Sequence, residues 1–424
     1  MKLLIKNGHV VDPADKIDGI ADILIEGGRI SKVGAGLDTK AETIIDAGGK
    51  IVMPGIVDMH VHLREPGRED KETVFSGTKA AAKGGITSVL CMPNTLPSLD
   101  SIEIIAALKE IIRKTANIDV FICGAITTGR LGRELTNAGA FKKEGITAIS
   151  DDGASVDSDS LMSKAFEKAK KEKLLIICHS EDKALSLKGV ANLGFTSTRL
   201  GLRGISNESE YKRVARDIKL AEEKGAAVHI AHVSSRESVE IIRKAKKKGI
   251  SVTSETAPHY FALSEEDLLD YNTNMKVNPP LRARGDILAI IEGLKDGTID
   301  AIASDHAPHT ENEKEIEFEH AEFGSTGLET ELAVSITELV CKGILGWSGL
   351  AEKMSFNPAK ILGIDKGSLG IGKDADMIII SPDKEWIVKK ECLVSKSKNS
   401  AFLGRKLKGA VEYTIHKGKV IYKA

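Results

Sequence analysis

The sequence predicts an α/β protein: a (β/α)8 barrel of the TIM type with a small composite β-sandwich domain from both termini. One observation is the regular alternation of short aliphatic runs and amphipathic helix patterns through the middle of the 424 residues. This alternation is typical of a parallel sheet covered by helices. A second is the pattern at both ends of the chain, where strand-like runs are separated by glycine turns. A third is that histidines and carboxylates recur where the aliphatic runs end.

The two ends of the chain share a pattern of short strands. Near the N-terminus we expect strands at Leu3–Val11, Ala21–Glu26, Arg29–Val33 and Thr43–Asp46. Towards the C-terminus we expect them at Asp376–Ile380, Val411–Ile415 and Lys419–Tyr422. The pairs Gly27-Gly28 and Gly48-Gly49 are typical of hairpin turns. We therefore expect residues 1–52 and 366–424 to form one composite β domain, with the barrel in residues 53–365.

Eight aliphatic runs follow one another through the middle of the chain. They begin at Ile56 and continue with Thr87–Met92, Val120–Gly124, Thr147–Ser150, Leu174–Cys178, Ala227–His232, Ile250–Ser254 and Ala301–Ser304. Helix patterns between them include Lys71–Lys83, Ser101–Lys114, Ser160–Lys171, Tyr211–Lys224 and Arg236–Lys247. Eight such units over about 250 residues favour a closed barrel. An open doubly wound sheet is the alternative, but the early strands are not followed by a glycine-rich dinucleotide turn.

Composition argues against several classes of partner. Lys+Arg 60 against Asp+Glu 61 gives a net charge of -1, so neither nucleic acid nor an anionic membrane surface is expected as the main partner. The N-terminus lacks a signal-like apolar segment, and we expect a cytoplasmic protein without membrane spans. The odd number and wide spacing of Cys91, Cys123, Cys178, Cys341 and Cys392 predict free, buried thiols.

The stretch Val57–Gly67 is the first candidate for chemistry. On a strand, alternate side chains share a face, so His60 and His62 can bind one metal ion. The alternative is that both are hydrogen-bonded packing residues. Further histidines and aspartates follow later strands, namely Asp151, Asp152, His179, His229, His232, Asp305, His306 and His309. Because a barrel places its chemistry at the carboxyl ends of its strands, this distribution favours a metal site.

Seven motifs carry a resemblance to a known family. They are HVHLREPG, CMPNT, SDDG, ICHSED, HIAHVS, VNPPLR and ASDHAPH, which begin at His60, Cys91, Ser150, Ile177, His229, Val277 and Ala303. Together they resemble the bacterial type I dihydroorotases of the amidohydrolase superfamily. The similarity extends over nearly the whole chain, including both terminal segments.

The resemblance implies a site for two zinc ions. His60, His62 and Asp305 would bind one ion, His179 and His232 the second, and Asp152 both. Two neighbouring divalent ions need a bridging anion, which many superfamily members, hydantoinases among them, supply as a carbamylated lysine. Residues 147–153 contain no lysine, so Asp152 is the substitute. The second zinc could bind more weakly. Asp151, His229, His259 and His306 are expected to be packing or supporting groups.

The resemblance also implies a substrate site and a reaction. Arg64, Asn94 and His309 would hold a carboxylate, as a guanidinium does well. Contacts to the pyrimidine ring would come from Asn278 and the backbone of Phe323 and Gly324, and His62 would also touch the substrate. The implied reaction is the reversible cyclisation of N-carbamoyl-L-aspartate to L-dihydroorotate in pyrimidine biosynthesis, with Asp305 transferring the proton.

Two alternatives stay open. The chain could be another cyclic amidase, such as dihydropyrimidinase, hydantoinase or allantoinase, which would need no residues to bind a substrate carboxylate. It could also be an inactive scaffold paralogue that supports aspartate transcarbamoylase, although such paralogues lose metal ligands and every expected ligand is present here. A homodimer is expected, and a complex with aspartate transcarbamoylase is considered. Residues 310–324, rich in glutamate, should form an exposed loop near the site.

Overall fold

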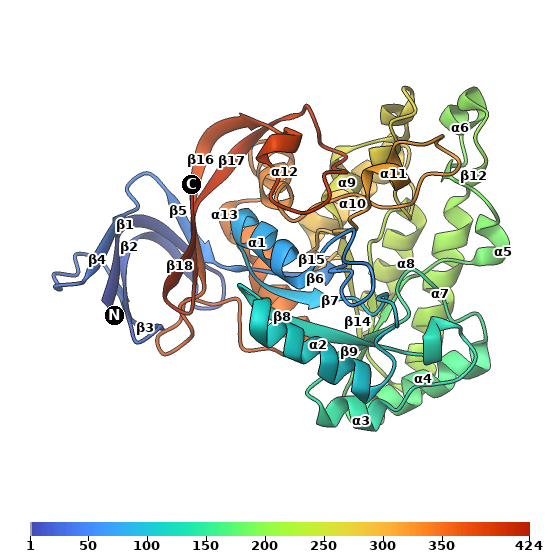
Figure 1. Ribbon diagram of the computed structural model, residues 1–424, viewed down its shortest axis with the longest axis horizontal. Coiled ribbons are helices and arrows are strands. Elements are labelled where there is room, and N and C mark those ends of the chain that lie inside the picture. Colours follow the sequence, from blue (N-terminus) through green and yellow to red (C-terminus); the bar gives the residue numbers. More distant parts are fainter. Residues whose placement is uncertain (1) are drawn as a thin grey trace.

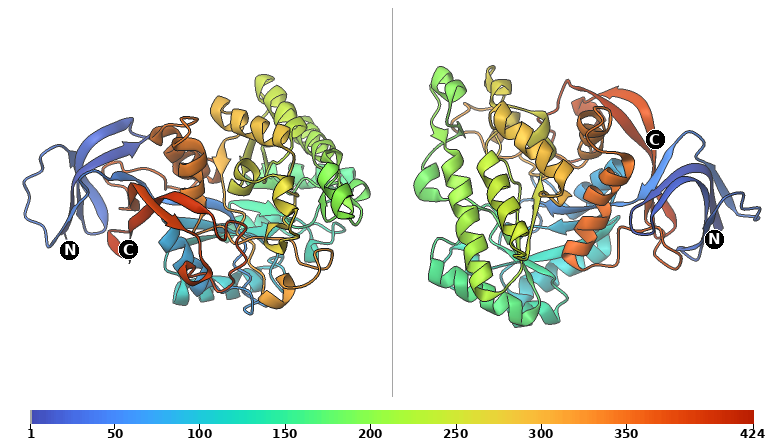
Figure 2. Two further views of the ribbon diagram at one scale, coloured as in Figure 1. Left: turned by 90° about the horizontal axis from the view of Figure 1, so that it is seen from above. Right: turned by 180° about the vertical axis from the view of Figure 1, so that it is seen from behind.

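The computed structural model describes residues 2–424 and has two parts, a parallel barrel and a terminal β domain. Figure 1 shows the first and last strands of the chain side by side at one end of the molecule, with the barrel at the other. The views from above and from behind in Figure 2 keep the same separation. The composite β domain and the barrel of the predicted fold class are therefore both present.

Eight parallel strands form the barrel. They are β6 (Ile56–Val61), β7 (Ile86–Cys91), β8 (Asp119–Ala125), β9 (Ala148–Ser150), β10 (Leu175–Cys178), β13 (Val228–Ile230), β14 (Val252–Thr256) and β15 (Ala301–Ile302). The sheet closes between its last and first strands through a parallel bridge of Val61 with His306. At this seam the His62 N–H donates to the His306 carbonyl at 2.9 Å. The closed barrel is confirmed, and the open-sheet alternative is wrong.

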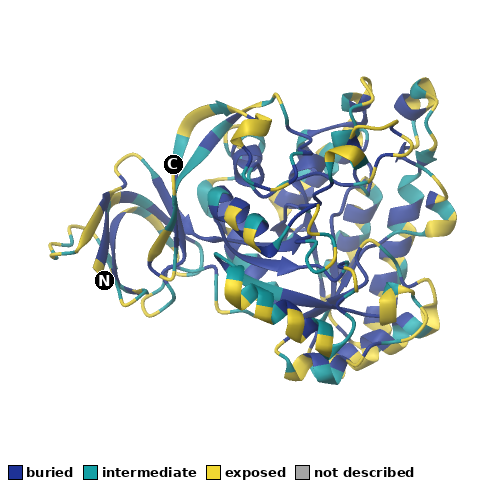
Figure 3. Ribbon diagram, in the orientation of Figure 1, coloured by how far each residue is buried: buried dark blue, intermediate teal, exposed yellow. Residues whose placement is uncertain are grey.

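Helices cover the outside of the barrel. The longer ones are α1 (Val74–Gly84), α2 (Ile102–Thr115), α4 (Asp159–Glu172), α7 (Asn207–Lys224), α8 (Arg236–Lys247) and α10 (Arg284–Asp296). The shorter ones are α3 (Ala138–Lys143), α5 (Lys183–Ser186), α6 (Phe195–Leu200), α9 (Pro258–Ala262), α11 (Glu311–Lys314), α12 (Glu331–Ser335), α13 (Trp347–Ala351) and α14 (Asn357–Leu362). In Figure 3 the helices are buried towards the strands and exposed outwards, as amphipathic patterns require.

The terminal sheet takes its strands from both ends of the chain. They are β1 (Lys2–Asp12), β2 (Ile17–Glu26), β3 (Arg29–Gly34), β4 (Thr43–Asp46), β5 (Ile51–Pro54), β16 (Met377–Ile387), β17 (Lys406–His416) and β18 (Lys419–Lys423). The antiparallel pairing of β5 with β16 joins the two ends. A single apolar cluster, to which Ile5, Ile23, Val52, Met377 and Ile415 belong, lies beneath the joined strands. Burial of this shared core is what holds the ends of the chain together.

One predicted hairpin is correct and the other is wrong. Gly27-Gly28 connects β2 to β3, which pair antiparallel. Gly48-Gly49 connects β4 to β5, but both of these strands run parallel to β1 and do not pair with each other. Asp46 Oδ1 accepts the Gly48 N–H at 3.0 Å, so the chain makes a local turn and continues along β1. A turn signal marks a break in a strand without fixing which strand it pairs with.

The cysteine prediction holds for three of five residues. Cys91, Cys123 and Cys178 are free and buried within or at the end of barrel strands. Cys341 and Cys392 are also free, but they are exposed, because they lie in short irregular segments outside the aliphatic runs. No helix within residues 2–424 combines the length and apolar character needed to cross a membrane.

Candidate active site

Histidine and aspartate side chains converge at the carboxyl ends of the barrel strands. The contributing residues are His60 and His62 at the end of β6, Asp152 after β9, His179 after β10, His232 after β13 and Asp305 after β15. The His60 ring is fully buried, and the Asp305 side chain is 12% exposed. The six residues predicted as metal ligands therefore lie in one place, although strands from all around the barrel contribute them.

The first group of ligand atoms surrounds the Asp305 carboxylate. His62 Nε2 lies 3.4 Å and His60 Nε2 3.7 Å from Asp305 Oδ1. Asp152 faces the same two rings, with Oδ1 3.2 Å from His60 Nε2 and Oδ2 3.5 Å from His62 Nε2. Ligands at about 2.0–2.1 Å from a tetrahedral ion lie about 3.3 Å from one another. The spacing of these atoms therefore fits a metal ion bound among them.

The second group shares Asp152 with the first. His179 Nδ1 and His232 Nε2 each lie 3.5 Å from Asp152 Oδ1. Both oxygens of Asp152 thus face imidazole nitrogens, as a carboxylate that bridges two ions would. Asp152 Oδ1 and His60 Nε2 are buried and have no hydrogen-bond partner within residues 2–424. Buried atoms of this kind are costly unless something else binds them, so the donor set fits a metal centre.

Three of the histidines place their other ring nitrogen against an acceptor. The pairs are His60 Nδ1 with Glu255 Oε1 at 2.6 Å, His62 Nδ1 with Asn94 Oδ1 at 2.7 Å, and His179 Nε2 with Glu181 Oε2 at 3.3 Å. An N–H that donates to such an acceptor leaves the opposite nitrogen as a lone pair directed at the centre. These contacts therefore set the tautomer that metal binding needs.

Two of these acceptors, Glu181 and Glu255, were not among the predicted site residues. Burial would raise the pKa of Glu255, but the neighbouring His60 and His229 rings hold it at about 2. The signal that could have revealed Glu255 is its place directly after the predicted strand Ile250–Ser254; in the structure it lies in the buried part of β14, where an unpaired carboxylate would be costly. Glu181 gives another signal, because it lies in the ICHSED motif three residues after β10 ends at Cys178.

Asp305 is ionised in this site. Burial would raise its pKa, but the hydrogen bond to His62 and the charges of His60 and His232 keep it below its usual range. Asp305 and His232 have positive φ angles of 47° and 35°, a conformation rare for residues other than glycine. Both lie where a strand has just ended. Backbone strain of this kind is concentrated at functional sites, where surrounding contacts maintain it.

A cavity of about 320 Å³ opens over the ligand cluster. Its lining includes all of the residues predicted to contact substrate, namely His62, Arg64, Asn94, Asn278, His309, Phe323 and Gly324. The structure therefore brings the predicted substrate residues and the predicted metal ligands together around one space.

Arg64 and His309 form the cationic side of this cavity. Arg64 Nη2 lies 3.2 Å from His309 Nε2, and Arg64 Nε donates to the Pro308 carbonyl at 3.2 Å. Burial lowers the pKa of Arg64 to about 10, so the guanidinium stays charged at neutral pH. Asn94 uses its carbonyl oxygen on His62, which leaves its amide N–H groups for another partner. A carboxylate between these groups would gain charge-assisted hydrogen bonds.

Asn278 and the 323–324 backbone also line the cavity, and the Phe323 carbonyl oxygen lies 2.8 Å from His309 Nε2. Asn278 Nδ2 lies 3.3 Å from Glu181 Oε2, and the Gly324 N–H donates to the Lys276 carbonyl at 2.8 Å. Gly324 has a φ of 143°, and a Cβ there would lie 2.7 Å from the Ala307 carbonyl oxygen. A glycine is therefore required for the chain to pass this close to the cavity.

Arg130 also lines the cavity, although it was not predicted as a site residue from the sequence. Its guanidinium is partly buried, and its Nε has no partner among residues 2–424. A Cβ at Gly153 would lie 3.4 Å from Arg130 Nη2 and 3.6 Å from Asn94 Nδ2, so the glycine leaves space between these donors. The sequence around Arg130, Thr127-Thr128-Gly129-Arg130, has no motif or charge pattern that would indicate a site residue.

Residues expected to support the site have other partners. Asp151 accepts the N–H groups of Ile126 at 2.8 Å and Thr127 at 3.0 Å. His229 Nδ1 lies 2.8 Å from Thr253 Oγ1. His306 Nε2 lies 3.3 Å from Glu72 Oε2, and the His259 ring packs edge-on against Tyr260. These partners are not among the six converging residues, which agrees with packing or supporting roles.

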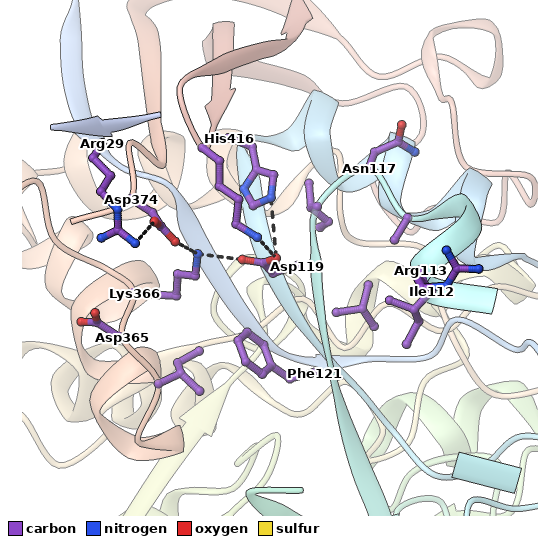
Figure 4. Close-up of a pocket in the computed structure, with 15 residues that line it drawn as sticks. Arg29, Ile112, Arg113, Asn117, Asp119, Phe121, Asp365, Lys366, Asp374 and His416 are labelled. Atoms are coloured by element: carbon purple, nitrogen blue, oxygen red, sulfur yellow. Dashed lines mark hydrogen bonds and ion pairs between the residues drawn. The ribbon is translucent and has the colours of Figure 1, made fainter. Parts of the chain in front are cut away.

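A third histidine and carboxylate group lies at the other end of the barrel, beside a cavity of about 650 Å³ (Figure 4). It comprises Asp119 at the start of β8, Asp376 and His416. Lys366 Nζ already lies 2.7 Å from an oxygen of Asp119 and of Asp376, and 3.1 Å from Asp374. Because this ammonium occupies the position that a cation would take, the group forms an ion-pair network between the barrel and the terminal β domain.

Known proteins resemble this chain over its whole length. A family model described as Dihydro-orotase-like matches residues 49–238. A protein named Dihydroorotase from Elusimicrobium minutum is 52% identical over 420 residues, 99% of this chain and 97% of its own. One of the same name from Geotalea daltonii is 51% identical over 424 residues, 100% of both chains.

Solved structures with a similar fold carry a different name. The L-hydantoinase (dihydropyrimidinase) from Arthrobacter aurescens has a TM-score of 0.90 at 28% identity, over 99% of this chain and 96% of its own. A D-hydantoinase has a TM-score of 0.89 at 26% identity, over 100% and 95%. Sequence identity is about twice as high to the proteins named Dihydroorotase. The chain therefore belongs to the dihydroorotase family.

Proposed function

We propose that this protein is a zinc-dependent dihydroorotase, which interconverts N-carbamoyl-L-aspartate and L-dihydroorotate in pyrimidine biosynthesis. The observation that carries the proposal is the single cavity in which a histidine and aspartate cluster lies beside Arg64 and His309. The cluster suits a metal that activates an amide, and the cationic pair suits the carboxylate that distinguishes dihydroorotate from a neutral ring.

The donor set supports zinc as the metal, because imidazole nitrogens with carboxylate oxygens are typical zinc ligands. His60, His62 and Asp305 would hold one ion, His179 and His232 a second, and Asp152 would serve both. When bound, the metal polarises the ring carbonyl and makes a water molecule more acidic. Zinc content of the purified protein, measured by elemental analysis, tests this part.

Asp305 would carry the proton between the reacting groups. In ring opening, water adds to the ring carbonyl carbon and gives a proton to the Asp305 carboxylate. As the C–N bond breaks, Asp305 delivers that proton to the departing ring nitrogen. In ring closure the same proton moves in reverse. Arg64, Asn94 and His309 would hold the substrate carboxylate throughout, while Asn278 and the 323–324 backbone would contact the ring.

A hydantoinase is the nearest alternative, because the solved structures cited above carry that name. Their substrates would be hydrolysed at a similar metal centre, but a neutral ring would leave Arg64 and His309 without an anion. Rates on dihydroorotate, dihydrouracil and hydantoin, measured on one preparation, separate the two. We expect dihydroorotate to be preferred by at least about a hundredfold, because a neutral substrate would leave the buried Arg64 and His309 without a partner, which is costly. Preference for a neutral ring would overturn the proposal.

An inactive scaffold that supports aspartate transcarbamoylase is the other alternative. It would not be expected to keep six ligand atoms at metal-binding distances. We propose the homodimer, the cytoplasmic setting and a possible complex with aspartate transcarbamoylase from the family resemblance. Sedimentation of the protein alone, and of a mixture with aspartate transcarbamoylase, measures both kinds of association.

A further inference from the structure

Lys71 is a buried lysine beside the substrate cavity, and it is not among the predicted site residues. It lies between β6 and α1 and is 5% exposed. Its Nζ is 3.0 Å from His309 Nδ1 and 2.9 Å from Glu313 Oε1. Glu313 also accepts from Arg68 at 2.6 Å and from the Thr310 N–H at 3.0 Å, so the first turn of α11 holds the lysine against the histidine.

The contact with Lys71 determines which nitrogen of His309 carries the proton. An ammonium group has only donors, so Nδ1 must accept through its lone pair. The neutral ring then carries its hydrogen on Nε2. Burial and the charges of Arg64, Lys71 and Lys314 lower the pKa of His309 to about 2, which Glu313 offsets only in part. His309 is therefore neutral at physiological pH, in one tautomer.

The resulting Nε2–H donates to the Phe323 carbonyl oxygen at 2.8 Å, at the edge of the substrate cavity. Arg64 Nη2 lies 3.2 Å from the same nitrogen and is a second donor beside it. A substrate carboxylate oxygen next to this pair would share the Nε2–H with the Phe323 carbonyl and accept from Arg64, whereas a lone pair on Nε2 would repel it.

We propose that Lys71 is a positioning residue that locks His309 in its Nε2–H tautomer, so that His309 donates to the substrate carboxylate. The inference rests on the proposed function for the identity of the anion. Without Lys71, Nδ1 could instead carry the hydrogen and donate to Glu313 Oε2, now 3.6 Å away. Nε2 would then accept from Arg64 and face the substrate with its lone pair.

The tautomer itself is measurable without substrate or activity. Nitrogen-15 shifts of the imidazole distinguish a protonated from an unprotonated ring nitrogen, and a His309→Gln variant identifies the His309 signals. We expect wild type and Lys71→Arg to show Nε2 protonated and Nδ1 unprotonated, and Lys71→Met to show the reverse or a mixture. The same Nε2–H pattern in Lys71→Met would overturn the inference, whatever reaction the protein catalyses.

Kinetics supply the functional half of the test. We expect Lys71→Met to raise KM for dihydroorotate at pH 8 by about tenfold, the value of one hydrogen bond to a charged group, with a smaller change in kcat. The defect should be similar at pH 6, because burial and the charges of Arg64 and Lys314, which also lower the pKa of His309, remain in the variant. A purely structural role for Lys71 would not couple the change in KM to a change in the His309 tautomer.

Lys353→Met is the matched control. Lys353 is similarly buried at 6% exposed, and its Nζ donates to the Ile299 carbonyl at 2.7 Å, just before β15 begins at the far end of the barrel. We expect this variant to lose stability and keep the wild-type KM at both pH values. Equal KM values for Lys71→Met and Lys353→Met would contradict the inference. Absence of dihydroorotate turnover in wild type, with the expected tautomers present, would instead count against the proposed function.

Discussion

His60 Nδ1 lies 2.6 Å from Glu255 Oε1, although the two residues are 195 positions apart in the chain. The same carboxylate has its other oxygen 3.3 Å from His229 Nε2. Glu255 is thus a buried anion between two imidazoles, and it directs the Nε2 lone pair of His60 towards the candidate metal ligands. Groups in this position raise the basicity of a metal-binding histidine and fix its orientation.

Replacing Glu255 with glutamine should therefore weaken metal binding without removing a ligand. We expect the affinity for zinc to fall by about 10–100-fold, the usual effect of such a change. Competition with a chelator of known affinity measures it. The matched control is Glu331→Gln, because Glu331 is another buried carboxyl group but has no hydrogen-bond partner within residues 2–424. Equal zinc affinity of the two variants would refute the role of Glu255.

Asp305→Asn removes the proposed proton carrier and keeps the shape of the side chain. We expect kcat for dihydroorotate hydrolysis to fall by at least about a hundredfold, the lower range for loss of general acid and base catalysis. The fold should persist, with much of the metal still bound, because His60 and His62 remain. Circular dichroism and elemental analysis provide those two controls. Turnover at the wild-type rate would exclude Asp305 from proton transfer.

Arg64→Met tests the choice of an acidic substrate. Loss of a bidentate, charge-assisted contact should raise KM for dihydroorotate by about 10–100-fold. A neutral ring gains nothing from Arg64, so any residual rate on dihydrouracil should change little. The ratio of the two rates, before and after substitution, is the measurement. A parallel loss on both substrates would mean that Arg64 serves the metal site or the fold rather than the carboxylate.

Lys366→Met tests the ion-pair network of Figure 4. Breaking a largely buried pair costs about 3 kcal/mol, which for a chain of this size lowers the midpoint of thermal unfolding by roughly 3 °C. Burial would raise the pKa of Asp376, but His416 and Lys366 hold it at about 2. Its pairing therefore stabilises the fold above the unfolded pKa of about 4, and this contribution is lost as pH falls towards 2.

The midpoint of thermal unfolding of Lys366→Met should thus lie below that of wild type by the whole amount at pH 7, and by less at pH 3. Differential scanning calorimetry at both pH values measures it. Identical midpoints at pH 7 would show that the network does not stabilise the fold.

Features that depend on neighbouring residues in the chain were predictable from the sequence. The barrel strands were predictable because each is a short aliphatic run, and the candidate ligands were predictable because each follows such a run directly. Asp152, His179 and Asp305 could be assigned to one site before any contact was known, since a closed barrel places all strand ends at one mouth.

Pairing between distant segments was not predictable in the same way. The turn at Gly48-Gly49 was recognised, but the parallel pairing of β4 and β5 with β1 depends on the tertiary sheet. Glu255 and Lys71 look like ordinary charged residues in the sequence. They acquire roles only through His60 and His309, which approach them in the folded chain. One position, Arg130, gave no sequence signal at all.

The most direct test of the proposed function is the dependence of dihydroorotate hydrolysis on zinc in a single preparation. The protein should hold up to two zinc ions per chain and hydrolyse dihydroorotate, lose that activity when a chelator removes the metal, and regain it in proportion to added zinc. Hydrolysis that continues unchanged in the metal-free protein, or a fully zinc-loaded protein that leaves dihydroorotate intact, would contradict the account.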